Sequence, residues 1–193
     1  YEKNLFEYVT RFISLNELKF ENISRIDMCQ DFTEFENNML PQLFIKKFTN
    51  GTNLKIGKAK KIKTVFSQKE STHEFESLRF GSMLSEISYY LYNKTKEMNE
   101  VKWKPWINNK WSKGGLDKNK DKWRLEFSLK SSAKMVVNTG TGEAKELNTL
   151  DILKPDYMRL FFCVLREKYF RFVLNDGQKR KDRMRELKLF NRS

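Results

Sequence analysis

The 193-residue sequence contains a single histidine, His73, and only two cysteines, Cys29 and Cys163. One histidine excludes a catalytic site or metal site built from several histidines, and leaves His73 as one optional metal ligand. The two cysteines are distant and stand in apolar surroundings, which excludes a disulfide scaffold and a zinc site. They predict two buried thiols in a reducing, cytoplasmic compartment. No run approaches the roughly 18–20 apolar residues that cross a bilayer, so we expect no membrane partner.

Negative charge is also scarce. The chain has 38 Lys and Arg against 25 Asp and Glu, a formal net charge of +13 and a pI near 9.6. Such an excess concentrates polyanions around a domain, and nucleic acid is therefore the expected partner. The alternative is a merely basic protein. An anionic membrane surface is disfavoured, because no basic amphipathic helix stands apart from the rest of the chain.

The length fits one domain over residues 1–193, and composition excludes a disordered or collagen-like chain. The chain begins at Tyr1, not at methionine, and we expect it to be a fragment of a longer protein.

Apolar periodicity predicts an alternation of helices and strands. Helices are expected over 4–18, 33–48 with an interruption at Pro41, 104–111, from Pro155 onward, and as a basic C-terminal helix within 178–193. Strands are expected over 18–32, 54–68 (one or two strands), 74–80, 86–93, 123–130 and 169–174, with a loop or hairpin tip at 138–143. The strands 74–80 and 86–93 are expected to form a hairpin that turns at Gly81-Ser82. This order predicts an α+β fold with a central antiparallel sheet. The strands have one apolar and one polar face, so helices should pack mainly on one face and leave the other open for a ligand.

All four tryptophans fall within residues 103–123, among many lysines. Basic side chains neutralise phosphates and aromatic faces stack on unpaired bases, so this segment favours binding to single-stranded or distorted nucleic acid. The candidate DNA-binding residues here are Lys102, Trp103, Lys104 and Trp106. The alternative is that the tryptophans anchor a helical insertion in the core.

Two acidic residues lie on polar faces of predicted strands. Asp27 belongs to the strand that ends at Phe32, and Glu126 to the alternating strand Trp123–Lys130. Oxygen ligands on neighbouring strands suit Mg²⁺ or Mn²⁺. Basic candidates for DNA contacts share these faces: Arg25, Arg124 and Lys130. The alternative for each acid is a surface salt bridge.

A tyrosine-rich strand supplies a candidate nucleophile. By alternation Tyr90, Tyr92 and Lys94 share one face. A phenol oxygen can attack a phosphodiester while a cation balances the charge on the phosphoryl oxygens. The alternative is an ordinary half-buried strand.

Four blocks in order, RIDMCQDF, LRFGS, YLYNKTKEM and WRLEFSLK, resemble the replication initiation factor family, the trans-acting Rep proteins of rolling-circle plasmids and related mobile elements. The resemblance spans roughly residues 23–132, and the KWKPWINNKW segment is similar to versions from mobile elements of Bacteroides-type bacteria.

This resemblance implies a fold related to the rolling-circle Rep/relaxase nickases, with a carboxylate-dominated site. It implies Tyr92 as nucleophile and Asp27 and Glu126 as ligands of Mg²⁺ or Mn²⁺. The implied phosphate contacts are Lys94, Arg124 and Ser82. Alternatives stay open for the nucleophile and for the metal ligands: Tyr89, Tyr90, Asp31 and Glu76.

The first functional hypothesis is a metal-dependent, strand-specific nickase that initiates rolling-circle replication through a covalent 5′-phosphotyrosine. The second is a relaxase for conjugative mobilisation, and the third is a nucleic-acid-binding module without catalysis. The expected partner is origin DNA, single-stranded or in a hairpin. A host helicase and a second copy of the chain are further candidate partners.

Overall fold

The computed structural model describes residues 5–57, 61–69, 72–82, 84–133, 136–138, 144–146 and 150–191. The helices are α1 (Leu5–Leu15), α2 (Pro41–Thr49), α3 (Lys94–Glu100), α4 (Pro105–Lys113) and α5 (Pro155–Tyr169). The first five strands are β1 (Arg25–Phe32), β2 (Asn53–Lys55), β3 (Ile62–Lys69), β4 (Thr72–Phe80) and β5 (Ile87–Asn93). The others are β6 (Trp123–Lys130), β7 (Val136–Asn138), β8 (Ala144–Glu146), β9 (Phe172–Leu174) and β10 (Glu186–Leu187).

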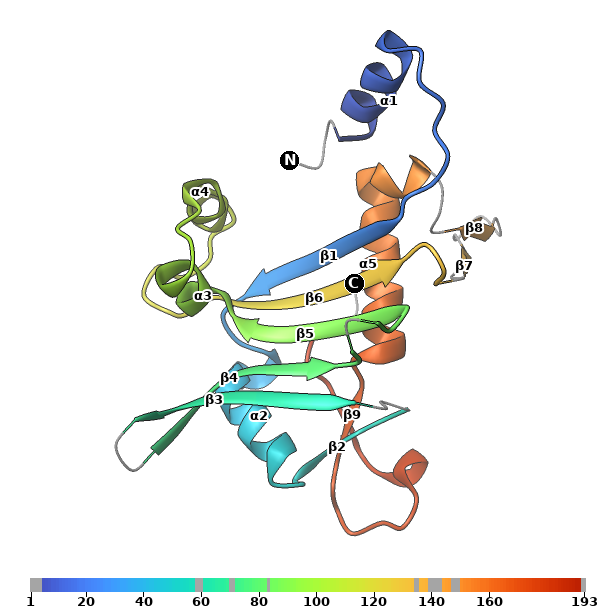
Figure 1. Ribbon diagram of the computed structural model, residues 1–193. Coiled ribbons are helices and arrows are strands. Elements are labelled where there is room, and N and C mark those ends of the chain that lie inside the picture. The colour runs from blue at the N-terminus through green and yellow to red at the C-terminus, as the bar shows by residue number, and fades with distance from the viewer. Residues whose placement is uncertain are drawn as a thin grey trace.

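A five-stranded antiparallel sheet in the order β1-β6-β5-β4-β3 forms the centre of the fold. Figure 1 shows α5 and α2 on one side of this sheet, α3 and α4 at the end where β5 finishes, and α1 beyond the start of β1. The predicted α+β class, with helices mainly on one face, is therefore confirmed.

The core lies between this sheet and helices α2 and α5. In β6 burial alternates residue by residue, with Leu125, Phe127 and Leu129 fully buried. Phe44 of α2 and Phe161 of α5 cover the same face. Because strand side chains alternate between the two faces, burying one set leaves the polar set on the opposite face of the sheet.

The turn between β4 and β5 confirms the predicted hairpin. Gly81 has φ +84°, and a Cβ there would meet the carbonyl oxygen of Ile87 and the side chain of Ser88 at 3.2 Å. Only glycine has both the conformation and the space that this turn requires. Mutation of Gly81 would therefore disturb the register of β5.

The helix predicted over 33–48 is shorter than expected. A 3-10 turn occupies Glu36–Asn38, with Asn37 and Asn38 at positive φ, and the α-helix begins at Pro41. Proline has no N–H to donate and a φ suited to the first helical turn, so Pro41 begins this helix and does not interrupt it.

The basic helix predicted within 178–193 is wrong. The segment forms a 3-10 turn at Lys181–Arg183 and then strand β10, which pairs with β9 in a small sheet β10-β9-β2. Beyond it Leu189 is 4% exposed and packs in the core. In the extended backbone Leu187 pairs with Phe172, and Leu189 packs in the core. Strand pairing and the burial of Leu189 therefore outweigh the helical spacing of the apolar residues in this segment.

The two thiols are less buried than predicted. Cys29 is exposed on the polar face of β1, and Cys163 is half-buried in α5. The apolar neighbours of Cys29 in sequence point to the other face of the strand, because side chains alternate. Of the predicted tip at 138–143, residues 139–143 lie outside the described part of the chain. No helix within the described ranges is long and apolar enough to cross a bilayer.

Candidate active site

The polar face of the large sheet is organised in two transverse rows, because residues opposite one another in antiparallel strands share a face. One row crosses all five strands from β1 to β3: Asp31, Arg124, Tyr92, Ser77 and Val65. The next row runs parallel to it: Cys29, Glu126, Tyr90, Arg79 and Lys63. Residues that are distant in sequence therefore meet around the end of β5.

Tyr92 and Glu126 form the central contact of this face. The Tyr92 hydroxyl donates a hydrogen bond to Glu126 Oε2 at 3.2 Å. Burial raises the pKa of Tyr92 well above its ordinary value, and the neighbouring charge of Glu126 raises it further. The phenol is therefore protonated at neutral pH, with a carboxylate placed to accept its proton.

The three neighbouring tyrosines are separated by the pleat of β5. Tyr89 points into the core, where its ring stacks on Phe80 at 4.7 Å. Tyr90 lies on the polar face and stacks on Tyr92 at a centroid distance of 4.6 Å. In this arrangement Tyr90 and Tyr92 share the open face, and Tyr89 does not.

Lys94 does not continue the strand, contrary to the prediction from alternation. It is the first residue of α3, whose N-terminus is capped by Asn93 Oδ1 accepting from the N–H of Lys96 at 2.9 Å. The Lys94 side chain is 3% exposed, is ion-paired with Glu97, and its Nζ lies 5.5 Å from the centre of the Tyr92 ring. The cation is still beside Tyr92, but it reaches this position from a helix.

The proposed metal ligands are not gathered into one cluster. Asp27 pairs in register with Ser128, one row beyond Glu126, and its carboxylate accepts from Arg25 Nε at 2.9 Å. Among the described residues no group of three or more His, Cys, Asp or Glu side chains is arranged to hold a metal ion. The carboxylate oxygens of Glu126 are the kind of ligand that a hard cation prefers, whereas the Asp27 carboxylate is in an ion pair with Arg25. The side chain of His73 lies outside the described part.

Arg124 and Asp31 form a bidentate ion pair that fastens α4 to the sheet. The guanidinium donates to the two Asp31 oxygens at 2.6 and 2.7 Å, and Trp111 Nε1 donates to the same carboxylate at 2.8 Å. Burial opposes the charge of Arg124, but its hydrogen bonds and charged neighbours together keep its pKa raised. Asp31 is therefore fully engaged as an anchor.

A pocket of about 330 Å³ opens on the β4 side of Tyr92. Its lining includes Glu126, Glu76 and two carboxylates that were not assigned to the site from sequence, Glu97 and Glu100. Glu76 had been left as an open candidate, and a shift in the β3–β4 register between Val65 and Phe66 makes it the extra residue of a bulge. Bulges re-aim side chains, and this one places Glu76 in ion-pair contact with Lys96. Glu97 could have been selected from sequence, because it closes the YNKTKE block.

The four tryptophans divide into two pairs. Trp111 and Trp123 are 6% and 2% exposed, whereas Trp103 and Trp106 are 55% and 48% exposed. The exposed pair lies where α3 passes into α4, close to the pocket residue Val101. Lys102 is exposed there, and Lys104 Nζ lies 3.7 Å from Glu97. The two tryptophans nominated for DNA contacts are thus the two that solvent can reach.

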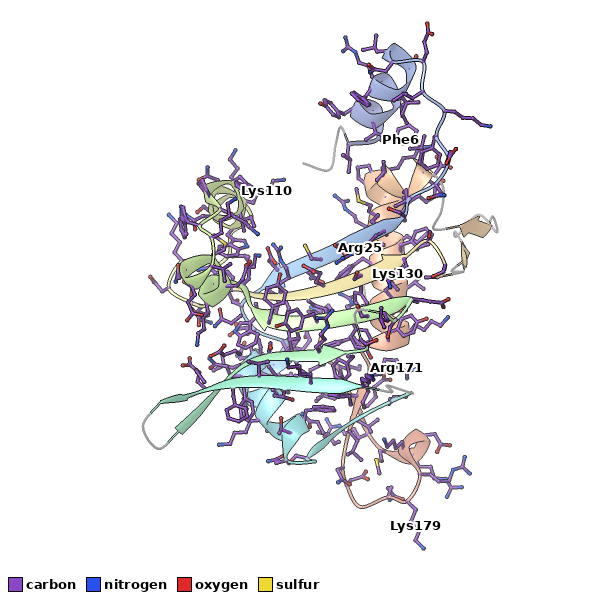
Figure 2. All side chains as sticks on the ribbon, viewed as in Figure 1. Phe6, Arg25, Lys110, Lys130, Arg171 and Lys179 are labelled. Carbon is purple, nitrogen blue, oxygen red and sulfur yellow. The ribbon has the colours of Figure 1, made fainter. Side chains whose placement is uncertain are left out.

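The remaining nominated residues lie away from Tyr92. Arg25 and Lys130 are opposite one another in β1 and β6, at the end of the sheet remote from Lys110 of α4 (Figure 2). Ser82 lies in the β4–β5 turn, where its hydroxyl is 3.2 Å from that of Ser85, whereas Tyr92 is near the other end of β5. None of these three lines the pocket.

The fold is similar to the structure of a rolling circle replication initiator protein from Geobacillus stearothermophilus, with a TM-score of 0.51 and 16% sequence identity. The similarity covers 94% of this chain and 57% of that chain, so this chain spans little more than half the length of that protein. At this identity the similarity shows the fold, and it agrees with the resemblance of the sequence blocks. No protein-family model matches the chain, and no curated protein sequence matches it.

Proposed function

We propose that this chain is a strand-specific DNA nickase and strand transferase that initiates rolling-circle replication. The observation that supports this most is the hydrogen bond from the Tyr92 hydroxyl to Glu126 on the open face of a sheet with the fold of a rolling-circle initiator. A nucleophile with an adjacent proton acceptor is the arrangement that group transfer to a side chain requires.

The reaction would exchange one phosphoester bond for another. The Tyr92 oxygen attacks the scissile phosphorus while its proton passes to Glu126. The bond to the 3′ oxygen of the preceding nucleotide breaks, and that oxygen leaves as a hydroxyl after taking up a proton. The product is a 5′-phosphotyrosine and a free 3′-hydroxyl. Because the bond energy is conserved in the ester, a later attack by a 3′-hydroxyl reseals the strand.

A cation near Glu126 would stabilise the phenolate of Tyr92 and so lower its raised pKa. We propose Mg²⁺ or Mn²⁺ at Glu126, which when bound supplies positive charge to the phosphoryl oxygens and the phenolate. Asp27 is the second proposed ligand, and its ion pair with Arg25 must open for it to serve. Lys94, 5.5 Å from the Tyr92 ring, adds a fixed positive charge from the chain itself.

DNA would approach along the polar face and the adjacent α3–α4 segment. The exposed rings of Trp103 and Trp106 offer stacking surfaces for unpaired bases, and Lys102 offers a phosphate contact. Arg25 and Lys130 extend the basic surface to the far end of β1 and β6. The net charge of +13 would draw the strand to this surface.

A covalent-adduct assay tests the proposal. The protein is incubated with a labelled single-stranded origin oligonucleotide and Mn²⁺, and the adduct is resolved on a denaturing gel. We expect Tyr92→Phe, which removes only the hydroxyl, to form no adduct, while Tyr89→Phe retains it. An adduct with Tyr92→Phe that is lost with Tyr90→Phe would transfer the role to Tyr90.

The same assay separates the competing functions. DNA binding without any adduct from the wild-type protein would favour a non-catalytic binding module. An adduct on a transfer-origin sequence and none on a replication-origin sequence would favour a mobilisation relaxase.

A further inference from the structure

The pocket beside Tyr92 has features that the nicking reaction does not use. Its floor is the sheet, and α3 forms one side through Lys96, Glu97 and Glu100. Three residues give the pocket apolar surface: Val65 on the edge strand β3, Val101 and the ring of Tyr90. The space therefore combines a flat aromatic wall with hydrogen-bond acceptors.

Ser77 is the unexplained polar group of this pocket. It lines the pocket, is 3% exposed, and its hydroxyl has no hydrogen-bond partner among the described residues. Its register partner in β5 is Tyr92, so the two residues lie directly opposite one another on neighbouring strands, on the same face of the sheet. A buried hydroxyl without a partner costs free energy, and a bound ligand is one way to satisfy it.

The charges in the pocket favour an uncharged ligand. Glu97 is paired with Lys94 and Lys104, and Lys96 pairs with both Glu76 and Glu100. These carboxylates already have cationic partners, yet their remaining lone pairs can accept hydrogen bonds. A phosphate placed among Glu76, Glu97 and Glu100, away from the cation proposed at Glu126, would be repelled by these carboxylates. The ligand that fits is flat, neutral and rich in N–H donors.

We propose that this pocket binds the unstacked nucleobase next to the scissile phosphate, and that it prefers a base with an exocyclic amino group. The proposal rests on the proposed function, which brings a DNA strand to Tyr92. Cytosine, adenine and guanine present amino donors to carboxylates, whereas thymine presents two carbonyl oxygens and no amino group. The base packs beside the stacked rings of Tyr90 and Tyr92, which both line the pocket together with Ser77.

The test measures base preference separately from cleavage. Labelled homo-oligonucleotides of deoxycytidine and of thymidine are titrated with the Tyr92→Phe protein without divalent ions, and fluorescence anisotropy gives the two dissociation constants. We expect tighter binding of the cytosine strand by at least about fivefold, the lower range for a well-placed pair of base contacts.

Variants in the same background assign the preference to the pocket. Ser77→Val, which removes the hydroxyl and fills the floor, should bind both strands with the thymine affinity of the parent. The matched control is Ser128→Val, the same change on the same sheet face but outside the pocket. Val65→Phe is a second variant, which fills the pocket from the edge strand β3. Because Val65 is 37% exposed, this change should not disturb the fold.

Each outcome is decisive. Equal binding of the two strands, or a preference that survives both pocket variants, would overturn the base pocket while leaving DNA binding intact. Loss of the preference in Ser128→Val as well would also overturn it. A preference that appears only with Mn²⁺ would place a cation there and overturn an uncharged ligand. No binding of either strand would overturn the proposed function itself.

Discussion

The two faces of β5 each hold a tyrosine beside a buried lysine, and the pairs behave differently. On the core face Lys55 Nζ lies 5.6 Å from the Tyr89 ring, and on the polar face Lys94 Nζ lies 5.5 Å from the Tyr92 ring. Lys55 donates only to main-chain carbonyls, those of Ile56 and Tyr169, among the described residues, and burial lowers its pKa to about 8.

Lys94 instead has a carboxylate partner, Glu97, and Tyr92 has Glu126. Burial raises the pKa of both Tyr89 and Tyr92, but of the two only Tyr92 has, within the part of the chain that the structure describes, a carboxylate that could take its proton. Burial alone gives an inert phenol. Burial beside a proton acceptor gives a phenol that can lose its proton, as the proposed role of Tyr92 requires.

The largest expected effect comes from removing that acceptor. Glu126→Gln keeps the shape and a hydrogen-bonding group but loses the negative charge. Because that charge adds to the effect of burial on the pKa of Tyr92, the pKa should fall in the variant toward the value that burial alone sets. Adduct formation should nevertheless fall by about a hundredfold or more, since the proposed base and the proposed cation ligand are both lost. Full activity in Glu126→Gln would show that the proton goes elsewhere.

On the core face the expected effect is on stability. Tyr89→Ala should lower the free energy of unfolding by about 3 kcal/mol, because it leaves a cavity against Phe80 and Phe127. Tyr92→Ala, at a half-buried position, should lower it by clearly less. Urea denaturation of both variants gives the comparison. An equal loss would mean that the polar face is packed as tightly as the core.

Lys55 predicts a pH dependence of stability on the core face. Its pKa is about 8 in the folded chain and near 10.5 when unfolded, so the unfolded chain binds more protons between these values. Stability should therefore rise with pH from about 8 to 10.5, by up to about 3 kcal/mol from this group. In Lys55→Met that part of the rise should vanish. An unchanged pH profile in Lys55→Met would refute the assignment.

The smallest expected effect concerns the exposed tryptophans. Trp103→Ala and Trp106→Ala should each weaken binding of single-stranded DNA by roughly fivefold or more, with unchanged stability, because each loses a stacking surface. Trp111→Phe is the control: it loses the hydrogen bond to Asp31 and should lower stability more than affinity.

Binding of DNA that barely changes between about 50 and 200 mM salt would contradict phosphate contacts altogether.

The sequence was sufficient where one local pattern decided the structure. Strand Trp123–Lys130 has the predicted bounds, because its alternation is uninterrupted and one face is entirely buried. The Gly81 turn was also predicted, since only glycine suits it. The division of the tryptophans was not predictable, because it depends on where α4 meets Asp31, far away in the chain.

The site was predictable in part. Alternation places Tyr92 and Glu126 on polar faces, but only the strand order brings those faces together. Lys94 was expected on the strand, and the Asn93 cap turns the chain into a helix one residue earlier. The bulge that aims Glu76 inward has no local sequence signal, because it arises from the mismatch between two paired strands.

The position of β5 in the middle of the sheet has a dynamic consequence. It is hydrogen-bonded to β4 on one side and β6 on the other, whereas β3 and β1 are edges. Its amide protons should exchange with solvent only when the whole domain opens, well after those of β3. We therefore expect the backbone of Tyr92 to belong to the slowest-opening unit of the chain. The proposed reaction would therefore require the DNA strand to adapt to the protein, because the proposed nucleophile is held in place.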